Sequence, residues 1–415
     1  MSEPARRRAG PPTAVTSVVL VLAMAAVVAC SADRVDRSAT TTAREVEPVP
    51  VDYSGRGPYP LGFARLSLPD RDVVVFYPAD GDRLEGTTPV TAYTSADVLP
   101  EQLRGFVPPE FSPVIPLDAH RDPPANPDGP FPLVLYSHGF GGFNLIASQQ
   151  AEHLASWGFV VAAPEHKERD LLATALGQVD TQGDPDVRDL RNTRALLEVE
   201  NTRTGSPLLG AVDVARVAAI GHSAGGRAAG LLAREGMVAT WIGQAPVPPL
   251  PRTDDPGGNA GAELADGSAL AQRLAAVSPP PVPSMIIAAQ DDGAIPLASV
   301  QQVFAWLAPP KTLAVLAGAG HNAFTDLCAP IRAQGGLTRF AGSIPVPIQI
   351  LQLGEDGCTE SSPDPQIAYD VIDHLMTAQL RWVFGFDPAP VSLAPAYVES
   401  LFPGALSTYE TTGPR

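Results

Sequence analysis

The chain has 415 residues, of which 45% are hydrophobic and 18% are charged, and a formal net charge of −17. This composition is typical of a packed globular protein, and the length allows one large domain or two ordinary ones. The acidic balance argues against a nucleic-acid partner, because binding to a phosphate backbone needs clustered Lys and Arg.

The first thirty residues have the pattern of an export signal. Arg6–Arg8 precede an uncharged, mostly apolar run from Thr13 to Ala29. Such a basic start and apolar run are typical of a signal peptide, and the run is short for a spanning helix, which needs about 20 residues. The residues Val27-Val28-Ala29-Cys30 resemble the lipobox of bacterial lipoproteins. Residues 1–29 are therefore predicted to be a signal peptide.

The resemblance to the lipobox implies that Cys30 carries lipid and that the protein is exported and anchored to the outer face of the cell membrane. A simply cleaved secretory peptide and an uncleaved N-terminal anchor are the alternatives. Without residues 1–29 the net charge would be −19. Anionic membrane surfaces would repel such a chain, so membrane attachment would have to come from the lipid.

The other two cysteines, Cys328 and Cys358, form an even pair in a chain expected to be exported. Such a pair suggests a disulfide, the alternative being two free buried thiols. Closing a loop of about 31 residues would stabilise the fold by roughly 3.5–4 kcal/mol.

Residues 30–55 are rich in Ser, Thr, Ala and charge without an apolar period, which predicts a flexible tether. From there to residue 385 strand patterns alternate with helix patterns. Strands are expected at 61–68, 73–77, 132–136, 159–163, 214–220, 238–242, 285–289 and 312–316. Helices are expected at 147–157, 186–200, 225–235 and 366–384.

This alternation favours a mostly parallel central sheet covered by helices, in a single domain over residues 56–385 followed by a tail at 386–415. Three stretches interrupt the pattern. Residues 108–132 are Pro-rich and are interpreted as a long surface connection. Residues 246–283 are dense in Pro and Gly, as a cap or irregular excursion would be, and residues 337–363 separate two predicted elements.

The sharpest motif is Gly221-His222-Ser223-Ala224-Gly225-Gly226, which follows a predicted strand and opens a predicted helix. This context is what a nucleophile elbow requires, because the glycines remove Cβ atoms that would clash in the tight turn. The turn would hold the Ser223 hydroxyl above the sheet, beside the positive end of a helix. Ser223 is therefore the candidate nucleophile, and His222 beside it is expected to point away and to be structural.

A serine hydroxyl needs a base, and His321 is the candidate because it follows the strand 312–316 in a loop of small residues. A carboxylate should orient that imidazole, and the order Ser, Asp, His is expected on this scaffold. Asp291 and Asp292 both follow the strand 285–289. Asp292 is favoured, since Pro296 ends the turn four residues later.

Backbone donors for a developing oxyanion are expected at two places. The first is the N–H of Ala224, which follows the nucleophile. The second is the N–H of Phe140, in the loop Ser137-His138-Gly139-Phe140-Gly141-Gly142, whose glycines allow N–H groups to turn inward. An ordinary glycine turn is the alternative for this loop, and His138 is expected to shape it.

These motifs together resemble the α/β-hydrolase superfamily, and more closely its secreted bacterial members similar to dienelactone hydrolases, platelet-activating-factor acetylhydrolases and chlorophyllases. Gly320-His321-Asn322-Ala323-Phe324 and Gly57-Pro58-Tyr59-Pro60-Leu61-Gly62 carry the same resemblance. Ser223 argues against dienelactone hydrolysis proper, which uses a cysteine. Ala245-Pro246-Val247 weakens an assignment as a polyesterase, because such relatives often carry an aromatic residue there.

The resemblance implies a serine hydrolase that cleaves a small-molecule or lipid ester through an acyl-enzyme on Ser223, without a metal or other cofactor. An acyltransferase with the same triad and a non-catalytic binding lipoprotein on a hydrolase scaffold are the alternatives. A Cys328–Cys358 bridge close after His321 is expected to stiffen the histidine loop.

Overall fold

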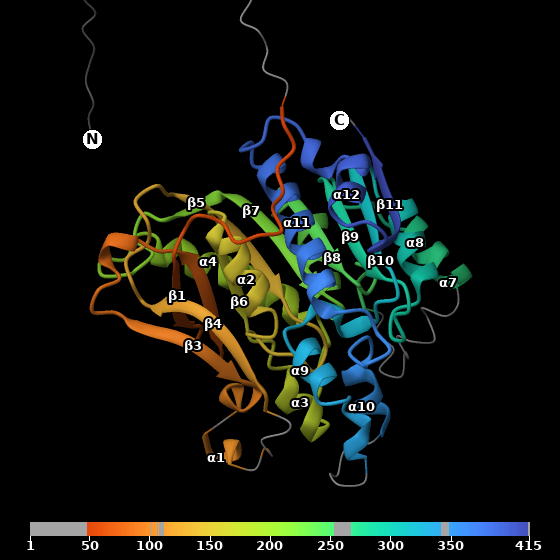
Figure 1. Cartoon of the computed structure of the whole chain (residues 1–415), viewed down its shortest axis with the longest axis horizontal. Coiled ribbons are helices and arrows are strands. Elements are labelled where there is room, and N and C mark those ends of the chain that lie inside the picture. The colour runs from red at the N-terminus through yellow and green to blue at the C-terminus, as the bar shows by residue number, and fades with distance from the viewer. Residues whose placement is uncertain are drawn as a thin grey trace, which may run out of the picture. The chain divides into compact units, whose positions relative to one another are not determined.

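The computed structural model describes residues 48–415 except 100, 106, 108–111, 253–266, 342–347 and 414–415. The predicted signal peptide, Cys30 and most of the predicted tether lie outside the described residues. Residues 48–415 form one compact unit (Figure 1). Among the helices that the structure describes, none combines the length and apolar character needed to span a bilayer.

One sheet of eleven strands runs through this unit, in the order β11-β10-β9-β8-β7-β5-β6-β2-β1-β4-β3. The six strands from β10 to β6 are mutually parallel, whereas β2 and β11, which flank them, pair antiparallel. The bounds are β1 Leu61–Ser67, β2 Asp72–Pro78, β3 Thr88–Thr94, β4 Val114–Arg121, β5 Phe131–Ser137, β6 Val160–Pro164, β7 Val212–His222, β8 Thr240–Gln244, β9 Ser284–Ala289, β10 Lys311–Leu316 and β11 Leu406–Thr412.

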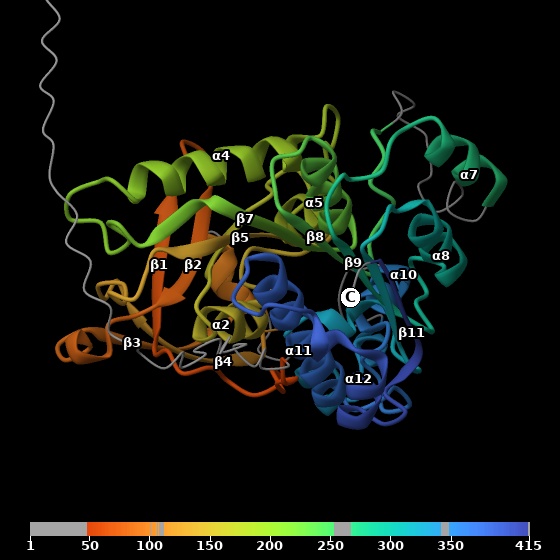
Figure 2. The same ribbon diagram turned by 90° about the horizontal axis from the view of Figure 1, so that it is seen from above.

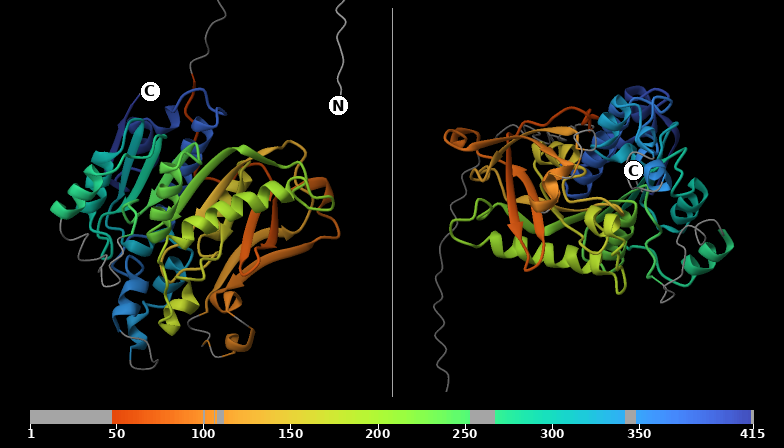
Figure 3. Two further views of the ribbon diagram at one scale, coloured as in Figure 1. Left: turned by 180° about the vertical axis from the view of Figure 1, so that it is seen from behind. Right: turned by 90° about the horizontal axis from the view of Figure 1, so that it is seen from below.

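Helices cover both faces of the sheet. Helices α4 and α5 lie over one face, and α2 and α11 lie over the other (Figures 2 and 3). The bounds are α1 Glu101–Arg104, α2 Ser148–Ser156, α3 Leu171–Leu176, α4 Pro185–Glu200, α5 Ala224–Arg234, α7 Gly267–Ala275, α8 Leu297–Trp306, α9 Cys328–Ala333, α10 Ile348–Glu355, α11 Pro365–Val383 and α12 Pro395–Leu401.

The continuous apolar runs in the central strands follow from this layering. Along β5, Leu133 and Leu135 face the core under α4 and α5, whereas Val134 and Tyr136 face the core under α2 and α11. All seven residues of β5 are buried. A strand buried on both faces needs apolar residues at every position, because successive side chains point to opposite faces.

Several sequence-based boundaries were wrong. The segment 108–132 contains strand β4, whose buried residues alternate with less buried ones, so its Pro content did not prevent it from pairing with β1 and β3. The predicted tether ends earlier than residue 55, because Tyr53 is buried against Trp157. The predicted tail contains α12 and β11, and β11 pairs antiparallel with β10 through six residue pairs.

The interrupted stretches also contain structure. Helix α7 lies within residues 246–283, and α10 lies within residues 337–363. Because the six central strands are parallel, their carboxyl ends share one edge of the sheet. The loops after β5, β7, β9 and β10 therefore converge there, which is where ligands bind in parallel α/β sheets.

Candidate active site

Ser223 lies in a strained turn between β7 and α5. Its φ of 55° and ψ of −121° are values that residues with a Cβ rarely adopt. A Cβ on Gly221 would lie 2.3 Å from the Gly225 carbonyl oxygen, and a Cβ on Gly225 would lie 1.9 Å from the Ser137 carbonyl oxygen. These positions accept only glycine, so the sequence motif follows from the geometry of the turn.

Backbone hydrogen bonds on both sides hold this turn. The Ser223 N–H donates to the Gln244 carbonyl at 2.9 Å. The Ser223 carbonyl accepts from the N–H groups of Arg227 and Val247 at 3.2 and 3.0 Å. Strain at one residue persists only where its surroundings over-determine it, and here the neighbouring strand and the new helix do so.

His321 and Asp292 are hydrogen-bonded at the same edge of the sheet. The distance between His321 Nδ1 and Asp292 Oδ2 is 2.9 Å, and both side chains are buried. The other oxygen of Asp292 accepts from the N–H groups of Ala294 and Ile295. Asp291 is exposed. The structure therefore joins the imidazole to Asp292 and not to Asp291, and none of the described hydrogen bonds uses His321 Nε2.

His222 does not point away from the site, as the sequence interpretation had it. Its ring lies 4.7 Å from the His321 ring between centroids, and its Nε2 donates to the His321 carbonyl at 2.9 Å. Burial lowers the pKa of His222 well below its usual value, so the ring is neutral. His222 thus ties the histidine loop to the serine turn. Among the described hydrogen bonds none joins Ser223 Oγ to His321, a bond that often tightens only with substrate bound.

The loop after β5 forms a tight turn beside Ser223. The Gly142 N–H donates to the Gly139 carbonyl at 3.2 Å, and Gly141 at the third position of the turn has a φ of 68°, as a type II turn requires. A Cβ built on Gly139 would lie 3.2 Å from Ser223 Cβ. In the described part of the chain the N–H groups of Phe140 and Ala224 have no protein acceptor.

The disulfide predicted between Cys328 and Cys358 is present. Two residues before Cys358, one oxygen of Asp356 accepts from the N–H groups of both Gly293 and His321, at 2.8 and 3.1 Å. The loop that carries Asp356 therefore joins the Asp292 loop to the His321 loop. This is a role that the sequence analysis did not assign.

A cavity of about 1080 Å³ lies beside the glycine turn, on the side of the N-terminal strands. Its wall includes Phe143 and Leu145 just after the turn, and Leu171, whose N–H donates to the Gly142 carbonyl. Ser223 is not among the lining residues. Within the described residues no group of three or more His, Cys, Asp or Glu side chains has an arrangement that suits a metal ion.

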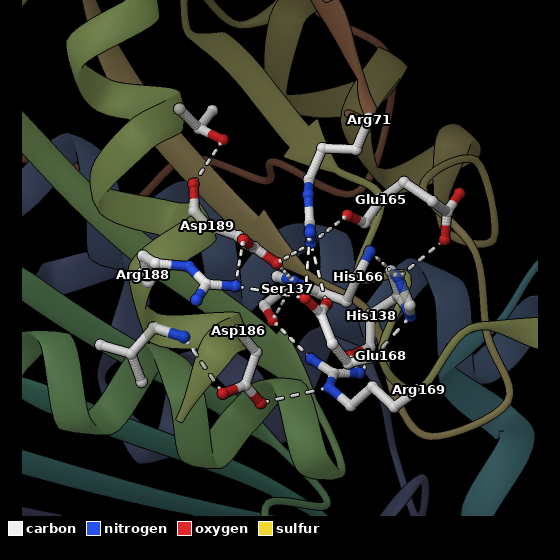
Figure 4. A network of polar contacts seen from close by, with 12 residues as sticks. Arg71, Ser137, His138, Glu165, His166, Glu168, Arg169, Asp186, Arg188 and Asp189 are labelled. Atoms are coloured by element: carbon white, nitrogen blue, oxygen red, sulfur yellow. Dashed lines mark hydrogen bonds and ion pairs between the residues drawn. The ribbon is translucent and has the colours of Figure 1, made fainter. Parts of the chain in front are cut away.

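A buried polar network behind the glycine turn was also missed at the sequence level (Figure 4). His166 had no distinguishing context in the sequence, yet its Nδ1 contacts Asp189 at 2.9 Å and its Nε2 contacts Ser137 Oγ at 2.8 Å. Arg169 is also buried in this network. The available signal was the charged run Glu165–Asp170, because it directly follows a buried parallel strand.

The mostly parallel sheet flanked by helices, with a serine turn after β7 and the Asp292 and His321 loops after β9 and β10, defines an α/β-hydrolase fold. Comparison with known proteins adds a more particular likeness. Residues 113–204 match the family model "Platelet-activating factor acetylhydrolase, isoform II". This segment contains the glycine turn and Arg169, but not Ser223, Asp292 or His321.

Two curated relatives are both called platelet-activating factor acetylhydrolase. The protein of Cavia porcellus is 31% identical over 133 aligned positions, and the match covers 23% of this chain and 30% of the relative. The protein of Canis lupus familiaris is 44% identical over 57 residues, 12% of this chain and 13% of the relative. The chain thus spans less than a third of the length of either relative.

Proposed function

We propose that the protein is a serine hydrolase of carboxylic esters, with Ser223 as nucleophile, His321 as base and Asp292 as the carboxylate that orients the base. The observation that carries this proposal is the His321–Asp292 hydrogen bond at 2.9 Å beside a serine held in a strained turn. The N–H groups of Phe140 and Ala224 are proposed as the oxyanion donors.

The first step is acylation of the serine. Because His321 Nδ1 donates to Asp292, Nε2 carries the free lone pair and accepts the Ser223 proton while Oγ attacks the ester carbonyl carbon. The carbonyl oxygen then bears the negative charge, and the two N–H groups stabilise it. Collapse of the tetrahedral intermediate breaks the bond to the alcohol, which leaves with the proton from His321.

The second step releases the acid. A water molecule gives a proton to His321 Nε2 and attacks the acyl carbon, and Ser223 Oγ leaves with that proton. The ester class is proposed to include lipid esters, as the family resemblance implies; the matched family model and the relatives are named platelet-activating factor acetylhydrolase. In the alternative function, an acyltransferase, an alcohol would attack the acyl-enzyme in place of this water.

We further propose that the protein is exported and held to a membrane by lipid on Cys30, with the residues that follow Cys30 as a tether. The support is the apolar run and the sequence before Cys30. Labelling with a radioactive fatty acid tests this part: wild type should incorporate label and Cys30→Ala should not. Equal label in both proteins would contradict lipidation at Cys30.

The enzymatic proposal is tested with chromogenic short-chain esters on wild type, Ser223→Ala and His321→Ala. Because the triad acts as a unit, either substitution should reduce kcat by about 10⁶. A fluorophosphonate probe should label wild type and not Ser223→Ala. Equal hydrolysis by wild type and Ser223→Ala would exclude Ser223 as nucleophile, and no labelling of wild type would favour a binding protein. Ester products formed with added alcohols would favour an acyltransferase.

A further inference from the structure

Arg169 is a buried cation close to the glycine turn. Its side chain is 1% exposed and forms an ion pair with Asp186 at 3.1 Å, between Nε and Oδ2. Burial of a guanidinium is costly unless its N–H groups are all used. The remaining contacts of Arg169 show where those N–H groups are directed.

The guanidinium of Arg169 donates to consecutive backbone carbonyls of the glycine turn. Nη1 lies 2.5 Å from the His138 carbonyl oxygen and 2.8 Å from the Gly139 carbonyl oxygen. Nη2 donates to Ser137 Oγ at 3.1 Å. Figure 4 shows the Arg169 guanidinium beside both Asp186 and Ser137. The planar guanidinium therefore hydrogen-bonds both the end of β5 and the start of the glycine turn.

The backbone of Arg169 holds the other end of the same turn. Its carbonyl accepts from the Gly141 N–H at 2.8 Å. The turn between Gly139 and Gly142 is thus bonded to one residue from both ends. Because the side chain and the backbone act together, the turn has little freedom to rotate its peptide planes.

The direction of the Phe140 N–H follows from the planarity of the peptide bond. In a trans peptide the C=O and the N–H point in opposite directions across one plane. The Gly139 carbonyl faces Arg169, His138 Nδ1 and the Gly142 N–H. The N–H of Phe140 belongs to the same plane and must face away from this buried network.

The direction away from the buried network is the direction of Ser223. A Cβ on Gly139 would lie within 3.2 Å of both Ser223 Cβ and His222 Nδ1. The Phe140 N–H has no acceptor among the described residues. An oxyanion site needs an N–H donor that has no other acceptor and that is held in a fixed direction, since no reorganisation is then required during the reaction.

We propose that Arg169 is a positioning residue that aims the Phe140 N–H at the developing oxyanion by holding the carbonyl of the same peptide. The inference rests on the proposed function, since it needs ester chemistry at Ser223. Arg169 itself touches no substrate, and Asp186 keeps its guanidinium in place.

Arg169→Lys is the first test, since lysine keeps the positive charge but lacks the planar guanidinium that donates to several acceptors at once. A donor that acts only in the transition state affects kcat more than KM. We expect kcat to fall roughly 10- to 100-fold, below the 10²–10³ typical of losing an oxyanion donor outright, with KM nearly unchanged. The matched control is Arg381→Lys. Arg381 is a half-buried arginine in an ion pair with Asp387 at 3.1 Å, and its described hydrogen bonds go to Tyr53 and Asp387, away from both the glycine turn and the serine turn.

A double-mutant cycle separates positioning from general destabilisation. Phe140→Pro removes the N–H, so Arg169→Lys should lower kcat little further in that background. Full additivity of the two effects, or an equal loss in Arg381→Lys, would overturn the inference. If Arg169→Lys does not fold, Arg169→Met with Asp186→Asn removes the buried ion pair as a unit and enters the same cycle.

The rate of Ser223 labelling by a fluorophosphonate provides an independent readout, because the phosphoryl oxygen occupies the same site as the oxyanion. Slower labelling in Arg169→Lys, with the control at the wild-type rate, supports the inference. If the wild type is active and Arg169→Lys has the same kcat and the same labelling rate, the inference about Arg169 is overturned and the proposed function stands. A wild-type protein that neither hydrolyses esters nor is labelled would overturn the proposed function as well.

Discussion

Replacing Phe140 with proline should remove one hydrogen-bond donor while leaving the local backbone unchanged. Phe140 occupies the second position of the turn that ends at Gly142, and proline favours this position in type II turns. The preceding residue is Gly139, which tolerates the restriction that proline imposes on its neighbour. The Phe140 side chain is 47% exposed, so its loss costs little packing.

The magnitude follows from the chemistry of the site. The Phe140 N–H has no acceptor in the described part of the chain, so proline breaks no hydrogen bond of the folded protein. In the transition state it removes one of the two proposed donors, which typically costs about 10²–10³ in kcat, or about 3–4 kcal/mol. KM should change by much less, because the donor acts on the oxyanion and not on the ground-state carbonyl.

The assay is steady-state hydrolysis of a short-chain chromogenic ester, with thermal unfolding measured on the same samples. Phe140→Ala keeps the N–H and removes the side chain, so it should lose far less rate than Phe140→Pro. If both variants lose the same rate, or if Phe140→Pro keeps wild-type kcat while its melting temperature is normal, the Phe140 N–H is not an oxyanion donor.

Four further outcomes are expected. Asp292→Asn should lower kcat by about 10⁴ and Asp291→Asn by little; the reverse order in the ester assay would contradict the geometry. Reduction of the disulfide should lower kcat before the domain melts, because its loop joins the acid and base loops; unchanged kinetics under reductant would refute this. Gly225→Ala should destabilise the fold by about 3 kcal/mol or more in denaturant titration, since its Cβ would meet a carbonyl at 1.9 Å. Burial raises the pKa of Asp326 to about 7. Folding therefore favours its protonated form, and the stability this gives is lost as pH rises from about 4 through 7. Between pH 4 and pH 8 the free energy of unfolding of Asp326→Asn should therefore fall by up to about 4 kcal/mol less than that of wild type. Equal pH–stability curves for the two proteins would show that the pKa of Asp326 is not raised.

The central strands and the serine turn could be predicted because their signals are local. A strand buried on both faces is a short apolar run, and β5, β7 and β9 appear as such runs. The glycines around Ser223 are required partly by contacts a few residues apart, such as that of Gly221 with Gly225, and partly by contacts with Ser137, His138 and Pro246. The edge strands β3 and β11, and β4 next to β3, were missed because each has exposed residues and pairs with segments that the sequence pattern does not reveal.

The sequence by itself determined the class of fold and the chemical types at the sheet edge, namely an alcohol, an imidazole and a carboxylate in the expected order. Only the tertiary structure decided between Asp291 and Asp292, because the choice depends on which side chain faces a ring 29 residues away. It alone also brought Arg169 to the carbonyls before Phe140, and Asp356 to the N–H of His321. Hydrogen bonds between loops of different strands leave no periodic trace in a single chain, since their partners are set by how the strands align and not by local spacing.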